Sequence, residues 1–189
     1  MNSHVLYEKL EISPVIAAIK TQEQLEKALL TDVEVIFVLS ARLTNLTELS
    51  EKIKKAGKTG FIHVDLVKGF SVDESIIEYI ARFTAFDGII STKASLISPA
   101  KKWHLLVIER FFLLDSLALE NVKKQLFSTQ ADVIELLPNI SPKVIAEIVN
   151  LTQKPVIVGG LIRDKEDIMS ALGAGSLAIS TTNSQIWQA

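Results

Sequence analysis

The sequence contains no cysteine, which excludes disulfide bridges, thiolate metal sites and cysteine nucleophiles. It also lacks any uncharged apolar run near the roughly 20 residues that a membrane-spanning helix needs. Residues 1–4 do not open a signal peptide, so we expect a cytoplasmic location and no membrane partner. With no low-complexity segment and no Ser/Pro-rich linker, residues 1–189 are expected to form one domain. The net charge is −2, so a nucleic-acid partner would have to bind a local basic patch.

Apolar residues make up 48% of the chain and occur in short runs of about four to eight. Such runs are typical of strands that are buried on both faces, and here they alternate with helical patterns joined by short loops. This order predicts an α/β fold with a parallel sheet covered by helices. About eight units are present, so we expect a small TIM-type (β/α)8 barrel, although about 200 residues is the usual lower limit. The alternative is an open doubly wound sheet, but no glycine-rich dinucleotide motif follows the first strand.

The expected elements follow the apolar runs and the helix-capping signals. Strands are predicted at residues 14–19, 33–39, 60–65, 87–92, 105–110 and 132–136, and within 155–163 and 175–183. Helices are expected after Thr21, over 46–56, after a capping box at 71–74, over 94–103 and 116–127, from Ser141 and over 164–173. The N-terminus around His4 is expected to be loose.

The last two strands carry the strongest functional signal. The seventh ends in Gly159 and Gly160, and the eighth ends in Ser180 and Thr181, with Asn183 beyond. In (β/α)8 barrels the loops after these two strands commonly bind phosphate, because backbone N–H groups approach the anion closely. A lone Gly-Gly pair is more often a tight turn. The pairing of two such loops favours the phosphate interpretation.

Function in such barrels lies at the carboxyl ends of the strands. Asp65, Glu109 and Glu135 fall near these ends and are candidate general acids or bases, or partners in ion pairs with Arg110 or Lys68. Arg110 itself is suited to bidentate phosphate binding. The remaining polar candidates at these ends are Ser91, Thr92, Lys93, Asn139, Arg163 and Thr182.

Histidine is sparse and gives no catalytic pattern. His63 lies inside the third predicted strand, where a buried core histidine is expected more than a base. No histidine and carboxylate spacing is typical of a zinc site. Binding of Mg²⁺ by Asp65 or Glu135 stays open at this point.

Lysines cluster toward the C-terminal ends of helices, at Lys52, Lys54, Lys55, Lys58, Lys101 and Lys102, with a further pair at 123–124. Favourable interaction with the helix dipole accounts for these positions without a partner. In a barrel, however, these helix ends share the face opposite the ligand loops. The clusters there are therefore also a candidate patch for an RNA or DNA backbone.

Seven segments together resemble the glycerol uptake operon antiterminator regulatory proteins. They are PVIAAIK at 14–20, HVDLVKG at 63–69, DGIIST at 87–92, RFFLLDS at 110–116, IELLP at 134–138, VIVGGLI at 156–162 and AIST at 178–181. The resemblance implies a small TIM-type barrel that senses glycerol 3-phosphate, binds leader mRNA and permits transcription past a terminator. It places the phosphate motif on Gly159, Gly160, Ser180 and Thr181, and the other ligand positions on Asp65, Lys68, Ser91, Thr92, Arg110 and Glu135.

We therefore predict a ligand-sensing, RNA-binding regulator without catalytic residues, cofactor or metal. The alternative is an enzyme acting on a small phosphorylated substrate, such as an isomerase, aldolase or phosphodiesterase, with Asp65 or Glu135 as acid or base. The sequence leaves the oligomeric state open, and a homo-oligomer is compatible with it.

Overall fold

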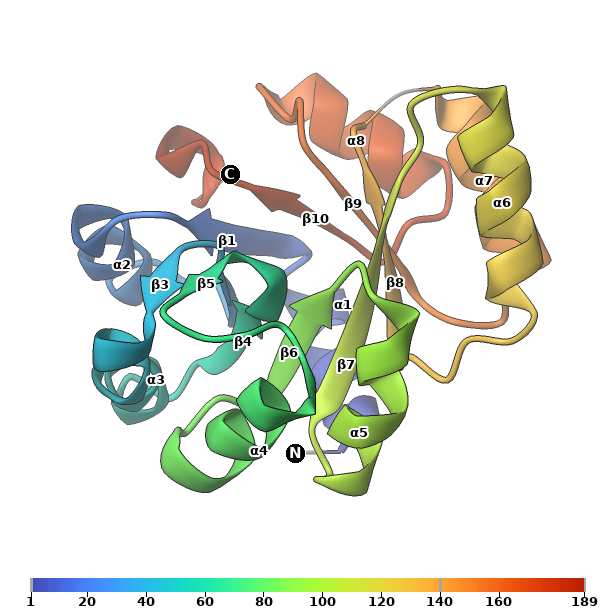
Figure 1. Ribbon diagram of the computed structural model, residues 1–189. Helices are drawn as coiled ribbons and strands as arrows, with labels where there is room; N and C mark the ends of the chain where they lie inside the picture. Colours follow the sequence, from blue (N-terminus) through green and yellow to red (C-terminus); the bar gives the residue numbers. More distant parts are fainter. Residues whose placement is uncertain (1, 140, 189) are drawn as a thin grey trace.

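The protein is described by a computed structural model that covers residues 2–139 and 141–188. Its centre is a closed barrel of eight parallel strands in the order β1-β10-β9-β8-β7-β6-β4-β2 (Figure 1). The strands are β1 (Val15–Ile19), β2 (Val35–Val38), β4 (Thr59–His63), β6 (Gly88–Ser91), β7 (Leu106–Phe112), β8 (Val133–Leu137), β9 (Val156–Gly159) and β10 (Ala178–Thr181). The predicted (β/α)8 barrel is confirmed, and every predicted strand overlaps one of these.

Helices surround the barrel and connect its strands (Figure 1). They are α2 (Gln22–Leu29), α3 (Leu46–Lys55), α4 (Glu74–Phe83), α5 (Ile97–Lys102), α6 (Ser116–Leu126), α7 (Pro142–Leu151) and α8 (Lys165–Gly173). Their starts follow from capping, since the side chains of Thr21, Asp115 and Asp164 accept hydrogen bonds from backbone N–H groups of the first turn. The capping box predicted at 71–74 is wrong, because Asp73 is the N-cap of α4 and accepts from the N–H of Ser75.

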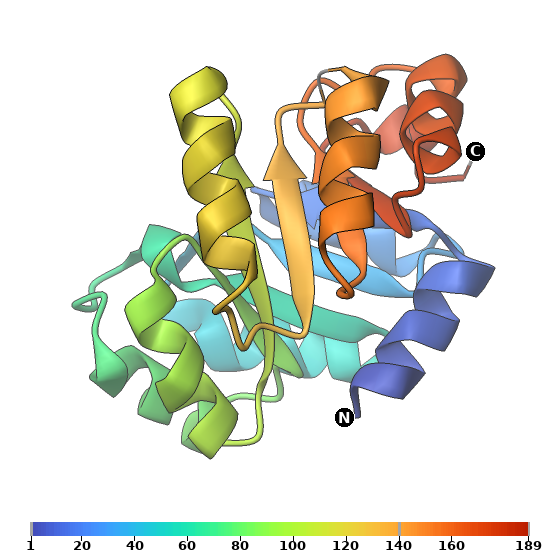
Figure 2. The same cartoon turned by 90° about the vertical axis from the view of Figure 1, so that its right-hand side faces the viewer.

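The N-terminus is not loose, as the sequence suggested, but forms helix α1 (Ser3–Ile12). Its Leu6 and Leu10 are fully buried and pack with the interior residues Ile16, Phe37 and Phe61 of the barrel. Figure 2 shows α1 on the side of the barrel away from the loop between β5 and α4. The helix therefore closes the end of the barrel at which the strands begin, and it leaves the other end for a ligand.

A two-stranded parallel ribbon, which sequence patterns did not predict, stands beside the carboxyl end of the barrel. It pairs β3 (Ala41–Arg42) with β5 (Val67–Lys68) (Figure 1). Ala41 and Val67 are buried in the outer core, whereas Arg42 and Lys68 are exposed. Each strand has only two residues, too few for the period-two alternation that identifies a strand in a sequence.

Two layers of apolar side chains stabilise the fold. The inner layer fills the barrel, and the larger outer layer joins the strands to the surrounding helices. This division explains the continuous apolar runs, because each strand is buried on both faces. None of the described helices is long and apolar enough to cross a membrane.

Candidate functional site

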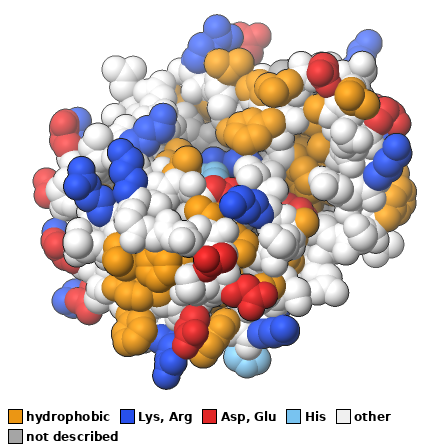
Figure 3. Space-filling view, viewed as in Figure 1, with side chains coloured by type: hydrophobic (Ala, Val, Ile, Leu, Met, Phe, Trp, Pro, Cys, Tyr) orange, Lys and Arg blue, Asp and Glu red, His pale blue; other side chains and the backbone are white. Residues whose placement is uncertain are grey.

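A pocket of about 210 Å³ opens at the carboxyl ends of the strands. Figure 3 shows a hollow at the centre of this face, with acidic, basic and histidine side chains on its floor. The pocket brings together three of the predicted phosphate-binding positions, Gly160, Ser180 and Thr181, with Arg110. Its other lining residues are Ala18, Lys20, Leu39, Leu137, Leu161, Ile162, Thr182 and Asn183.

Close packing at the end of β9 explains the first glycine. A Cβ on Gly159 would lie 2.4 Å from the Ser180 hydroxyl oxygen and 3.1 Å from Glu135 Oε1. The next two residues have left-handed backbones, with φ of 69° at Gly160 and 56° at Leu161. Glycine adopts this conformation freely, whereas leucine does so at a cost of roughly 1–2 kcal/mol. Among the described residues, the N–H of Leu161 has no acceptor, so it is available to an anion in the pocket.

A buried chain of polar contacts supports the floor of the pocket. Arg110 Nε donates to Glu135 Oε2 at 2.7 Å, and the hydroxyl of Ser180 donates to Glu135 Oε1 at 2.7 Å. The exposed fraction is 6% for Arg110 and 0% for Glu135. Arg110 thus forms the ion pair with a carboxylate that the sequence predicted, and it also lines the pocket. Within the described chain, Nε is the only nitrogen of its guanidinium group that binds a carboxylate.

The hydroxyl of Thr181 joins the two loops instead of pointing freely at a ligand. It donates to the carbonyl of Ile162 at 3.3 Å and accepts from the N–H of Asn183 at 3.1 Å. The amide of Asn183 donates in turn to the carbonyl of Arg163 at 3.1 Å. These contacts hold the β10 loop against the β9 loop, and residues of both loops line one pocket.

Asp65, Ser91 and Thr92 come together, as the sequence suggested, but in a separate cluster that does not line the pocket. Asp65 accepts from the Ser91 hydroxyl at 2.6 Å, and from the N–H and hydroxyl of Thr92 at 2.7 and 2.8 Å. Burial alone would raise the pKa of Asp65, but these hydrogen bonds hold it below its ordinary value. Both of its oxygens are thus engaged, which leaves Asp65 poorly placed as a general base. Among the described residues, no three metal-ligating side chains lie together.

His63 is buried at the end of β4, with 3% of its surface exposed, as expected for a core histidine. Burial and the nearby positive charge of Arg110 lower its pKa to about 4, so the ring is neutral at pH 7. Within the part of the chain that the structure describes, its Nδ1 has no hydrogen-bond partner, and it lies 3.9 Å from Asp65 Oδ2. The ring therefore lies within electrostatic reach of both Asp65 and Arg110.

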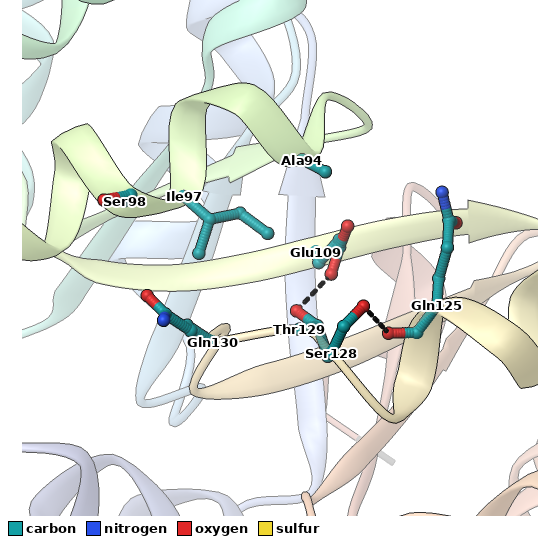
Figure 4. A pocket seen from close by; sticks show the side chains of 8 residues that line it. All are labelled: Ala94, Ile97, Ser98, Glu109, Gln125, Ser128, Thr129 and Gln130. Carbon is teal, nitrogen blue, oxygen red and sulfur yellow. Dashed lines mark hydrogen bonds between the residues drawn. The ribbon is translucent and has the colours of Figure 1, made fainter.

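Lys68 and Glu109 also lie away from the pocket. Lys68 is on the exposed face of the β3–β5 ribbon. Glu109 points outward from β7, toward α5 and the end of α6, and its carboxylate accepts a hydrogen bond from Thr129 (Figure 4). The alternation of strand side chains explains this, because Arg110, the next residue, points into the barrel. The prediction of Glu109 as a candidate acid or base is therefore wrong for this pocket.

Sequence reasoning did not assign Lys20 and Leu39, which line the pocket from the ends of β1 and β2. Lys20 directly follows a predicted strand at the carboxyl end of the barrel, which is the signal that could have identified it. Leu39 carried no comparable signal, because an apolar residue after a buried strand is common.

Comparison with known proteins shows the family to which this chain belongs. Residues 15–187 match the family model described as glycerol-3-phosphate responsive antiterminator. The chain belongs to this family. A glycerol uptake operon antiterminator regulatory protein from Listeria monocytogenes is 33% identical, with a TM-score of 0.87 over 92% of this chain and 94% of that one. A related protein from Thermotoga maritima is 31% identical, with a TM-score of 0.82 over 94% and 99%. The uncharacterized protein YgcP of Escherichia coli is 40% identical over 94% of this chain and 93% of its own length.

The family is one of regulators, so the prediction of a glycerol 3-phosphate responsive regulator is confirmed at family level and the predicted enzyme alternative is not supported.

Most lysines of the clusters at the helix ends have partners within the chain. Lys52, Lys54, Lys55 and Lys101 form ion pairs with Glu48, Asp87, Glu51 and Asp132, at 2.7, 2.9, 3.6 and 2.6 Å. Lys58 donates to the carbonyls of Thr31 and Val33. Only Lys102 among the six has no such contact within the described chain, and RNA binding by these lysines stays a prediction.

Proposed function

We propose that this antiterminator holds glycerol 3-phosphate in the pocket at the carboxyl end of the barrel and binds leader mRNA in response. The observation that carries the proposal is the convergence of Arg110, Lys20 and the β9 and β10 loops on one small pocket. Two cationic side chains and backbone N–H groups are the donors that a phosphate prefers. The proposed site of action is the cytoplasm.

The proposed orientation of the ligand follows from the lining. The phosphate group lies toward Gly160, Leu161 and Arg110, where the N–H donors and the guanidinium meet. The glycerol moiety then lies toward Ala18, Leu39 and Leu137, whose side chains are apolar. In this arrangement Glu135 does not contact the phosphate, because its oxygens bind Arg110 and Ser180. Its role is to orient the arginine.

For RNA, the β3–β5 ribbon is a better candidate than the lysine clusters. Arg42 and Lys68 are direct cross-strand neighbours, and both are exposed. Like charges placed opposite each other on a sheet are destabilising. Within the described chain neither side chain has a carboxylate at ion-pair distance, in contrast to Lys52, Lys54, Lys55 and Lys101. A polyanion would relieve this repulsion, and Figure 3 shows basic side chains beside the hollow on this face.

The proposed mechanism is linkage between the two sites. If the ligand favours the state that binds RNA, RNA must favour the ligand by the same factor. The test is a fluorescence titration of the leader transcript of the glycerol genes from the same genome, with and without glycerol 3-phosphate. We expect a lower Kd for RNA with ligand present, and a lower Kd for ligand, by the same factor, with RNA present. Equal RNA affinity in both conditions would contradict the proposal.

A further inference from the structure

We propose that the pocket on the outer face of β7, next to Glu109, is a second binding site and that it takes a small primary ammonium ion. This pocket has a volume of about 230 Å³ and lies outside the barrel. It is separate from the glycerol 3-phosphate pocket, because Glu109 and Arg110 are consecutive residues that point to opposite faces of β7. The proposal does not depend on the function assigned to the inner pocket.

Glu109 occupies a position where an apolar side chain is expected. Its neighbours on the same face of β7 are Val107 and Phe111, which belong to the core between the barrel and the helices. The exposed fraction of Glu109 is only 2%. A buried carboxylate is costly unless it is paired and hydrogen-bonded. Within the described chain it receives one hydrogen bond, from the hydroxyl of Thr129, and it forms no ion pair.

The charge of Glu109 is incompletely compensated. Burial raises the pKa of this carboxyl, and the hydrogen bond from Thr129 and the more distant charge of Lys154 offset burial only in part. The Thr129 hydroxyl bonds to Oε2, which leaves Oε1 for another donor. A cation in the pocket would supply both the missing charge and the missing donors.

The remaining lining is suited to an ammonium group. Apart from Glu109 it contains no charged side chain, and it includes the hydroxyl and amide side chains of Ser98, Gln125, Ser128 and Gln130. Figure 4 shows Glu109 directed toward Thr129, between the α5 side of the pocket and the end of α6. Ile97 and Ala94 give an apolar wall for a short alkyl chain. Three ammonium donors and a short tail match this combination.

The test uses propylammonium chloride as the probe and 1-propanol as its uncharged counterpart of similar size. Each is titrated into the full chain at pH 7, and backbone amide shifts of Ile97, Thr129 and Gln130 are followed by NMR. We expect saturable shifts with propylammonium and much weaker ones with propanol. Glu109→Gln should weaken propylammonium binding by roughly ten- to a hundred-fold, the size of one charge-assisted hydrogen bond.

Two further variants separate binding from folding. Ala94→Phe fills the pocket from its rim and keeps the carboxylate, so it should also abolish the shifts. Thr129→Val removes the internal hydroxyl and leaves the carboxylate, so propylammonium should bind at least as tightly as to the wild type. Equal shifts with both probes, unchanged affinity in Glu109→Gln, or no saturable shift in the wild type would each overturn the proposal. Glu120→Gln, at an exposed position of α6, is the control for the loss of one carboxylate.

Discussion

Arg110 and Glu135 lie directly opposite each other on β7 and β8 and form a buried ion pair at 2.7 Å. The pair is at the same time part of the floor of the candidate ligand pocket, because Arg110 lines it. The stability of the barrel and the position of its main cationic donor thus depend on one contact.

Replacing Glu135 with Gln should therefore affect folding and ligand binding together. Removal of one partner from a buried pair typically costs about 3–5 kcal/mol, because the other charge stays buried and uncompensated. We expect a lower free energy of unfolding in urea and a weaker affinity for glycerol 3-phosphate in calorimetry. The control is Glu147→Gln, which breaks an exposed pair with Lys123 and should cost at most about 1 kcal/mol. Wild-type ligand affinity in a folded Glu135→Gln protein would contradict the role given to the pair.

Gly159 and Gly173 provide a matched pair of glycine-to-alanine changes. At Gly159 the added methyl meets Ser180 and Glu135, so overpacking should destabilise the protein by about 1–3 kcal/mol and weaken ligand binding. At Gly173, the last residue of α8, no atom lies within 4 Å of the added Cβ. Alanine there should be neutral or stabilising by up to about 1 kcal/mol. The measurements are urea unfolding and ligand calorimetry, and equal effects at both positions would show that the close approach at Gly159 is unimportant.

Features with a local physical cause could be predicted from the sequence. The eight strands, the helix caps and the tight turn after β9 each have a signature within a few residues, such as Asp164 before α8 or Gly160 after β9. Features that depend on tertiary contacts could not be predicted in this way. Helix α1 is stabilised by burial of Leu6 and Leu10 against the barrel interior, and nothing near them in the sequence indicates that contact.

The direction of strand side chains decides which candidate residues face the inside of the barrel. Arg110 and Glu135 point inward, whereas Glu109 points outward, and the continuous apolar run around them hides this alternation. The lysines at the helix ends were a candidate RNA patch, with interaction with the helix dipole as the alternative explanation. The partners of Lys52 and Lys55 are glutamates four residues earlier on the same helix, so spacing could have indicated those two pairs. Asp132, the partner of Lys101, comes from a distant part of the chain, so that pair could not be read from spacing.

His63 should make the protein less stable in mild acid. Its pKa is about 4 in the folded state, against 6.5 for an ordinary histidine, because the ring is buried and close to Arg110. As pH falls from 6.5 to 4 the unfolded chain takes up a proton that the folded chain does not, so this residue lowers stability by about 3 kcal/mol over that range.

The measurement is urea unfolding at several pH values between 7 and 4. His63→Gln should remove most of this loss relative to wild type, whereas His104→Asn, at an exposed histidine, serves as the control. Parallel curves for wild type and His63→Gln would show that His63 does not cause the acid sensitivity.

The location of the RNA surface can be decided by two double variants with the same change in charge. Arg42→Gln with Lys68→Gln removes the two opposed charges of the β3–β5 ribbon. Lys52→Gln with Lys55→Gln removes two charges from the end of α3, where both are already paired with exposed glutamates. Lys54 is avoided, because its partner Asp87 is buried and also accepts from the N–H of Gly60, so a folding defect would follow.

We expect the ribbon variant to bind leader RNA more weakly and to reduce the slope of log affinity against log salt by about one for each RNA phosphate that the protein no longer neutralises. The α3 variant should retain wild-type affinity and slope, because a lysine that gives up an ion pair gains little from a phosphate. Affinity for glycerol 3-phosphate without RNA should change little in either, since Arg42 and Lys68 do not line the pocket. The opposite result, with binding abolished only in the α3 variant, would place RNA at the far end of the barrel. Coupling between the two ligands would then have to pass through the barrel itself, instead of across one face.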